Sequence, residues 1–180
     1  MLKTIIFIAA ISTGHYAMAH SCSEVADNTV EKDRLYAELL TTPNEMLGRA
    51  VGSQLWEIWI TAPDDEAQDL MDRGRERIRV ADYEKAIEYF TKLTEYCPLY
   101  AEGWNQRSYV YFLSQNYDAS LEDITKALDL EPRHFGALAG RATVLISMGR
   151  TEIGYDALRR ALALNPWLSE RHLLPQGDDI

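Results

Sequence analysis

The sequence of 180 residues lacks the short motifs that mark most catalytic sites. It contains no glycine-rich phosphate loop, no zinc-binding helix motif and no nucleophile elbow. Four histidines occur, and none is paired on one helical face with a second metal ligand. His134 directly follows the Pro132-Arg133 pair and is interpreted as the entry residue of a helix. We therefore expect a protein that is not an enzyme and has neither a cofactor nor a metal centre.

Basic residues are scarce. The chain has 18 lysines and arginines against 28 aspartates and glutamates, which gives a net charge of −10. An acidic surface repels phosphate backbones and anionic lipid headgroups. This charge balance excludes nucleic acid as an expected partner.

Long apolar runs are also missing. The apolar stretch from Thr4 to Ile11 is too short for a stable membrane anchor, which needs about 20 residues. It follows a positive start at Lys3 and precedes the small residues Ala17 and Ala19, an arrangement typical of a cleaved secretory signal. We expect residues 1–19 to be an export signal and the protein to reach a compartment such as the bacterial periplasm.

The chain has only two cysteines, Cys22 and Cys97. In an oxidising compartment a bridge between them would close a loop of about 75 residues and contribute roughly 4 kcal/mol in the chain-entropy model. The alternative is that Cys97 packs at the end of a helix while Cys22 stays unpaired. The sequence leaves both possibilities open, because it does not show how far apart the two α-carbons lie.

Three of the six prolines repeat at one interval. Pro98, Pro132 and Pro166 are each 34 residues apart (132 − 98 = 34; 166 − 132 = 34). A proline ends the helix before it, because it lacks an N–H donor and restricts the preceding residue. A period of 34 residues predicts stacked pairs of antiparallel helices. The three predicted units span residues 67–100, 101–134 and 135–168.

Residues in phase within these units carry a recognisable pattern. The middle unit is the clearest, with Trp104, Ser108, Tyr111, Ser120, Ala127 and Pro132. This pattern resembles the tetratricopeptide repeat family. The resemblance implies an all-α fold, an α-solenoid of three helical hairpins, which binds proteins or peptides instead of catalysing a reaction.

The segments that flank the repeats are predicted to close the solenoid. Residues 20–65 form a divergent N-terminal helical hairpin, which we expect to cap the first clear unit. Residues 169–180 form a short C-terminal tail. Trp167, Leu168, Leu173 and Leu174 either fold back over the last unit or leave a patch for self-association.

In the tetratricopeptide family the first helix of each unit lines a concave groove. The resemblance therefore implies that a peptide or partner protein contacts Met71, Arg75, Ile78, Arg79, Asn105, Tyr109, Phe112, Leu113 and Thr143. Arg75 and Arg79 would hold a carboxylate, while Tyr109 and Phe112 would hold an apolar side chain. The alternative for the arginines is that they neutralise nearby acids.

Some family members hold acidic chaperone tails with a carboxylate clamp of lysine, asparagine and arginine. The corresponding positions here are occupied by Met71, Arg75, Gln106, Gly136 and Gly140, so the clamp is not present.

The sequence thus predicts an exported, non-enzymatic scaffold that binds a peptide segment or partner protein in its concave groove. The first alternative is a structural homo-oligomer that assembles through the C-terminal end. A remote alternative is copper binding by His20, which cleavage after Ala19 would leave at the mature N-terminus.

Overall fold

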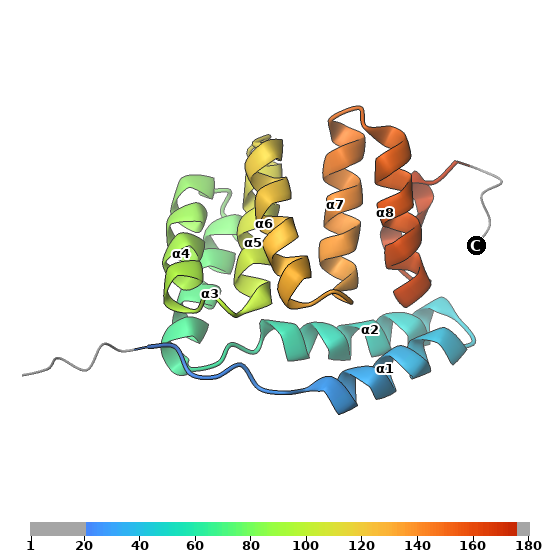
Figure 1. Ribbon diagram of the computed structural model, residues 1–180, viewed down its shortest axis with the longest axis horizontal. Helices are drawn as coiled ribbons and strands as arrows, with labels where there is room; N and C mark the ends of the chain where they lie inside the picture. Colours follow the sequence, from blue (N-terminus) through green and yellow to red (C-terminus); the bar gives the residue numbers. More distant parts are fainter. Residues whose placement is uncertain (1–20, 176–180) are drawn as a thin grey trace, which may run out of the picture.

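The computed structural model describes residues 21–175, and all regular structure in this range is helical (Figure 1). The helices of the described range are α1 (Thr29–Thr41), α2 (Glu45–Ile60), α3 (Asp65–Arg79), α4 (Tyr83–Tyr96), α5 (Ala101–Leu113), α6 (Tyr117–Leu130), α7 (Phe135–Ser147), α8 (Thr151–Leu164) and the short 3-10 helix η1 (Ser169–Leu173). The predicted all-α fold is confirmed.

The predicted export signal at 1–19, His20 and residues 176–180 lie outside the described part of the chain. Export and copper binding by His20 therefore stay predictions. Among residues 21–175, no helix combines the length and the apolar character that crossing a bilayer requires.

Three helical hairpins stand side by side: α3 with α4, α5 with α6, and α7 with α8 (Figure 1). Each hairpin turns at a residue with a positive φ angle, Ala81 at 56°, Gln115 at 59° and Gly149 at 75°. These residues are again 34 apart (115 − 81 = 34; 149 − 115 = 34). In each turn the next N–H donates to a carbonyl five residues earlier, as Asp82 does to Arg77 at 2.9 Å. The turn geometry therefore repeats with the same period as the prolines.

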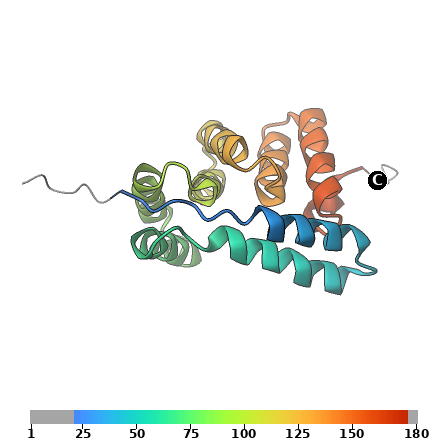
Figure 2. The same ribbon diagram turned by 60° about the horizontal axis from the view of Figure 1, so that its bottom comes forward.

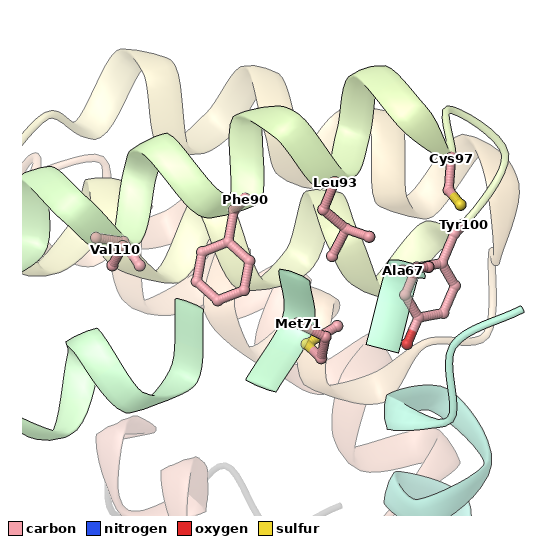
Figure 3. Packing of buried hydrophobic residues seen from close by; sticks show 8 residues of the cluster. Ala67, Met71, Phe90, Leu93, Cys97, Tyr100 and Val110 are labelled. Carbon is pink, nitrogen blue, oxygen red and sulfur yellow. The ribbon is translucent and has the colours of Figure 1, made fainter. Parts of the chain in front are cut away.

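Small residues let the two helices of a hairpin approach closely. A Cβ atom added at Gly74 would lie 2.5 Å from the ring of Phe90, and one at Gly154 would lie 2.7 Å from Ile146. In the first hairpin, Phe90 and Leu93 of α4 form one buried cluster with Met71 of α3 (Figure 3). Close approach and large apolar residues together fill the interior of each unit.

The N-terminal hairpin departs from its expected position as a cap on the first unit. Helices α1 and α2 instead run across the ends of the repeat helices, from the first unit to the third (Figures 1 and 2). At one end, the hydroxyl of Tyr100 donates to the carbonyl of Trp59 at 2.6 Å. At the other, the indole N–H of Trp167 donates to the carbonyl of Leu39 at 3.2 Å. The hairpin therefore braces the whole array.

The C-terminal residues fold back over the last unit. Leu168, Leu173 and Leu174 pack against the α8 cluster that contains Leu158 and Leu162. Trp167 packs on α2, where a Cβ atom at Gly48 would lie 2.1 Å from its indole ring. Most of the apolar surface at this end is thus covered by the chain itself.

Candidate functional site

The face formed by α5 and α7 is hollowed into a groove of about 640 Å³. Four of the residues predicted from the sequence line it: Asn105, Tyr109, Phe112 and Thr143. Ile124 of α6 lies beneath the groove, and Trp56 of α2 lies beside the first turn of α7. Helix η1 contributes Ser169, Glu170 and His172 to its wall. The two flanking segments of the chain therefore help to shape the groove.

Helix α7 presents mostly small residues to this groove. Ala139, Gly136 and Gly140 line it, and a Cβ atom at Gly140 would touch only Ile124, at 3.9 Å. On α5, Tyr109 and Phe112 supply aromatic surface, and Tyr109 is 48% exposed. The groove therefore combines aromatic rings on α5 with open space beside Gly140 on α7.

A second hollow of about 570 Å³ lies between α3 and α5. It is lined by three more of the predicted residues, Arg75, Ile78 and Arg79. Gln106 and Tyr109 line both hollows, so the two lie next to each other along α3, α5 and α7.

The prediction is wrong for Met71. Its side chain is fully buried and packs with Ala67 and Phe90 in the core of the first hairpin (Figure 3). Four residues along a helix correspond to a rotation of about 400°, so Met71 lies about 40° away from Arg75 around α3. That offset turns the thioether toward α4. Leu113, the last residue of α5, is half-buried and lines neither hollow.

The arginines of α3 differ in their partners. Arg79 forms an ion pair with Glu76, and Arg73 forms one with Asp69 at 2.8 Å. Arg75 has no ion-pair partner within 4.0 Å among the described residues. The proposed carboxylate seat therefore has one guanidinium without a protein counter-ion, at Arg75.

A buried polar cluster, absent from the sequence prediction, positions the groove amides. Oε1 of Glu102 accepts from Nε2 of Gln106 at 2.6 Å, and Oε2 accepts from Nδ2 of Asn105 at 3.0 Å. Oε2 also lies 2.7 Å from Nε2 of His134. Nδ1 of His134 accepts from the backbone N–H of Ala137, so Nε2 carries the ring proton and donates to Glu102. His134 is the N-cap of α7, in keeping with its predicted place at a helix entry.

The sequence offered only part of this cluster. Glu102, Asn105 and Gln106 stand at the i, i+3 and i+4 spacing that brings side chains together on one helix face. His134 is 32 residues away from Glu102, and no local pattern predicts that contact.

Cys22 and Cys97 are joined by a disulfide, with their α-carbons 5.1 Å apart. The bridge ties the segment before α1 to the end of α4. Asp64 supports it, because its carboxylate accepts from the backbone N–H of Ser23 at 2.8 Å and from the hydroxyl of Tyr96 at 3.2 Å. A hollow of about 1140 Å³ lies beside this bridge and shares no residue with the α5 and α7 groove. We assign the bridge a structural role.

Comparison with known proteins places these observations in a family. The sequence profile of the tetratricopeptide repeat matches residues 101–134, the same residues as the second predicted unit. A TPR repeat-containing protein of Rhizobium etli is 28% identical over 134 residues, which cover 74% of this chain and 66% of that protein. The chain spans 10% of the length of sperm-associated antigen 1 from Mus musculus and from Rattus norvegicus.

Solved tetratricopeptide domains have the same fold. The TPR2B-domain:pHsp70 complex of yeast Sti1 matches with a TM-score of 0.57 and 20% identity, over 61% of this chain and 91% of that one. The second TPR domain of human RPAP3, in complex with the HSP70 peptide SGPTIEEVD, matches with a TM-score of 0.56 and 26% identity, over 58% and 88%. Repeats of this kind generally serve as non-enzymatic interaction scaffolds. The period, the helical hairpins and these matches together identify residues 101–134 as a tetratricopeptide repeat and show that the chain has the fold of tetratricopeptide domains.

Proposed function

We propose that the protein is an exported, non-enzymatic scaffold that binds a peptide segment of a partner protein on the concave surface of α3, α5 and α7. The observation that carries the proposal is that two hollows adjoin each other at Gln106 and Tyr109. Two adjoining hollows of about 640 and 570 Å³ can accommodate an extended segment of several residues. The RPAP3 domain, which is similar to this chain, is itself in complex with a peptide.

The proposed mechanism is recognition by a preformed surface. The N-terminal ends of α5 and α7 are held by α2 and α1, so binding orders little of the protein. Affinity comes from an apolar contact with Tyr109 and Phe112 and from polar contacts along α5. A dissociation constant near micromolar corresponds to about −8 kcal/mol.

The proposal places the protein in an oxidising compartment. The predicted signal at 1–19 would deliver the chain to an oxidising environment, where the Cys22–Cys97 disulfide is expected to persist. Self-assembly through the C-terminal end has less support, because Trp167 and Leu173 already pack within the chain.

Site-specific photocrosslinking in cells tests the proposal. A photoreactive residue at position 109 should capture a partner, because Tyr109 lines both hollows. Position 153 on α8 is the matched control, since Ile153 is 50% exposed and lines neither hollow. Capture at 109 and not at 153 is the expected result. Equal capture at both positions, or capture at 153 alone, would move the binding surface away from the groove.

A further inference from the structure

Three hydroxyl groups that line the α5 and α7 groove donate their protons within the protein. The hydroxyl of Thr143 donates to the carbonyl of Ala139 at 3.0 Å, and the hydroxyl of Ser108 donates to the carbonyl of Asn105 at 2.7 Å. The hydroxyl of Ser120 donates to the carbonyl of Ser108 at 2.9 Å. Each of these hydroxyl groups already donates its only proton to a backbone carbonyl. Its oxygen can therefore only accept a hydrogen bond from a ligand.

The side-chain amides of Asn105 and Gln106 both turn their nitrogen atoms toward Glu102. Glu102 is only 1% exposed, and its carboxylate holds the amide nitrogens of Asn105 and Gln106. A carboxylate accepts and does not donate, which fixes the nitrogen of each amide on the side of Glu102. The amide oxygens then point to the opposite side. Neither oxygen accepts a hydrogen bond from another described residue.

The wall formed by η1 continues this pattern. Ser169 donates its hydroxyl proton to Glu170 at 3.1 Å. Nδ1 of His172 lies 2.6 Å from the carbonyl of Ser169 and must donate to it, which leaves Nε2 of the neutral ring as an acceptor. Glu170 is the one carboxylate or other fixed charge among the residues that line the groove in the described chain. The groove is thus rich in acceptors and negative in charge.

We infer that this groove selects a peptide segment with a basic side chain, lysine or arginine, which inserts between α5 and α7. This inference rests on the proposed function and names the ligand of that site. The ammonium or guanidinium group would donate to the oxygens of Asn105, Gln106 and Thr143. The rings of Tyr109 and Phe112 would cover its aliphatic stem and attract its charge, as aromatic faces attract cations. The overall charge of −10 favours the same ligand.

The sequence suggested an apolar side chain at Tyr109 and Phe112, and the inference replaces it with a basic side chain. A carboxylate needs donors, and each groove amide already gives one N–H to Glu102, while the hydroxyl of Thr143 donates to a backbone carbonyl. The neighbouring hollow differs, because the guanidinium groups of Arg75 and Arg79 line it and that of Arg75 has no ion-pair partner among the described residues. A segment that carries a basic residue in the groove and an acidic residue near Arg75 would satisfy both hollows.

Three pools of immobilised pentapeptides test the inference. The central residue is lysine, norleucine or glutamate, and the four flanking positions are random mixtures. Norleucine matches the length of the lysine stem without the charge. The lysine pool should retain at least ten times as much protein as either other pool. This preference should weaken as salt is raised, because salt screens the charge.

Substitutions in the groove test which residues cause the preference for lysine. Gln106→Met keeps the length of the side chain and removes the amide oxygen, so it should reduce the preference for lysine over norleucine at least fivefold. Gln54→Met is the matched control, because Gln54 is exposed on α2 and does not line the groove; it should leave the preference unchanged.

The outcomes separate the inference from the proposed function. Equal or stronger retention by the norleucine or glutamate pool would overturn the inference while leaving a peptide-binding groove. A preference for lysine that survives Gln106→Met would also overturn it, because the acceptors would then lie elsewhere. If no pool binds more protein than it does with a Tyr109→Ala variant, both the inference and the proposed function fail.

Discussion

The indole of Trp59 stacks on the imidazole of His134, with ring centroids 3.8 Å apart and ring planes 16° from parallel. Trp59 ends the apolar face of α2, and His134 is the N-cap of α7. The same imidazole donates to Glu102 at the start of α5. One ring therefore joins the N-terminal hairpin to the second and third repeats, at the point where the groove amides are oriented.

Removing this stack should release the N-terminal hairpin. Trp59 is 5% exposed, and a buried tryptophan replaced by alanine typically lowers the free energy of unfolding by about 3–5 kcal/mol. Urea denaturation of Trp59→Ala, followed by circular dichroism, measures the loss. Val30→Ala is the control at an exposed site of α1. A Trp59→Ala variant within about 1 kcal/mol of the wild type would show that the hairpin is held elsewhere.

The disulfide should account for a further part of the stability. It joins residues 75 positions apart, so the chain-entropy model predicts a loss of roughly 4 kcal/mol in a Cys22→Ser, Cys97→Ser double variant. The wild type treated with a reductant should unfold at the same urea concentration as that variant. A wild-type midpoint that does not move on reduction would mean that the bridge contributes little.

The ionisation of Asp64 should make the free energy of unfolding depend on pH. Its hydrogen bonds from the backbone N–H groups of Ala67 and Ser23 lower its pKa below the ordinary value of about 3.9. A carboxyl with a lowered pKa in the folded state contributes stability above the unfolded value and loses it as the pH falls through the folded value. An asparagine at this position would keep the cap at Ala67, because its side-chain oxygen still accepts, but it would lose the second acceptor, for Ser23.

We therefore expect Asp64→Asn to be about 1 kcal/mol less stable than the wild type at pH 7. This difference should shrink as the pH falls through the lowered pKa of Asp64, because both side chains are then neutral. Urea denaturation at pH 7 and at a pH below that pKa measures it. A difference of the same size at both would show that the charge of Asp64 plays no part.

Two glycines should respond in opposite ways to alanine. A Cβ atom at Gly48 would lie 2.1 Å from Trp167, so Gly48→Ala should displace the indole and cost about 1–3 kcal/mol. A Cβ atom at Gly140 meets only Ile124 at 3.9 Å, so Gly140→Ala should raise stability by up to about 1 kcal/mol through helix propensity. Denaturation midpoints and tryptophan fluorescence test the pair. Equal effects of the two substitutions would contradict the packing of Trp167 on α2.

The repeats were predictable from sequence because their signals are local. Pro98, Pro132 and Pro166 mark helix ends by backbone chemistry, and small residues such as Gly74 recur where helices touch. The exposed groove positions Arg75 and Tyr109 followed from the resemblance to the family and from helix geometry.

The remaining features depend on contacts between distant parts of the chain. The bracing position of α1 and α2 rests on pairs such as Trp167 with Leu39, which are 128 residues apart. The orientation of the groove amides depends on Glu102 and His134, which stand at opposite ends of the second unit. Burial of Met71 depends on the rotation of α3 against α4, and an offset of about 40° decides between core and groove.

Methyl NMR tests the central claim, that the hollow between α5 and α7 is the binding site, most directly. The alanine and isoleucine methyl groups of the protein are isotope-labelled, and the lysine-centred peptide pool is added in steps. The methyl signals of Ala139 and Ile124, which line the groove, should shift progressively while that of Ile153 on α8 stays in place. Shifts at Ile153 with unchanged signals from Ala139 and Ile124 would contradict the account.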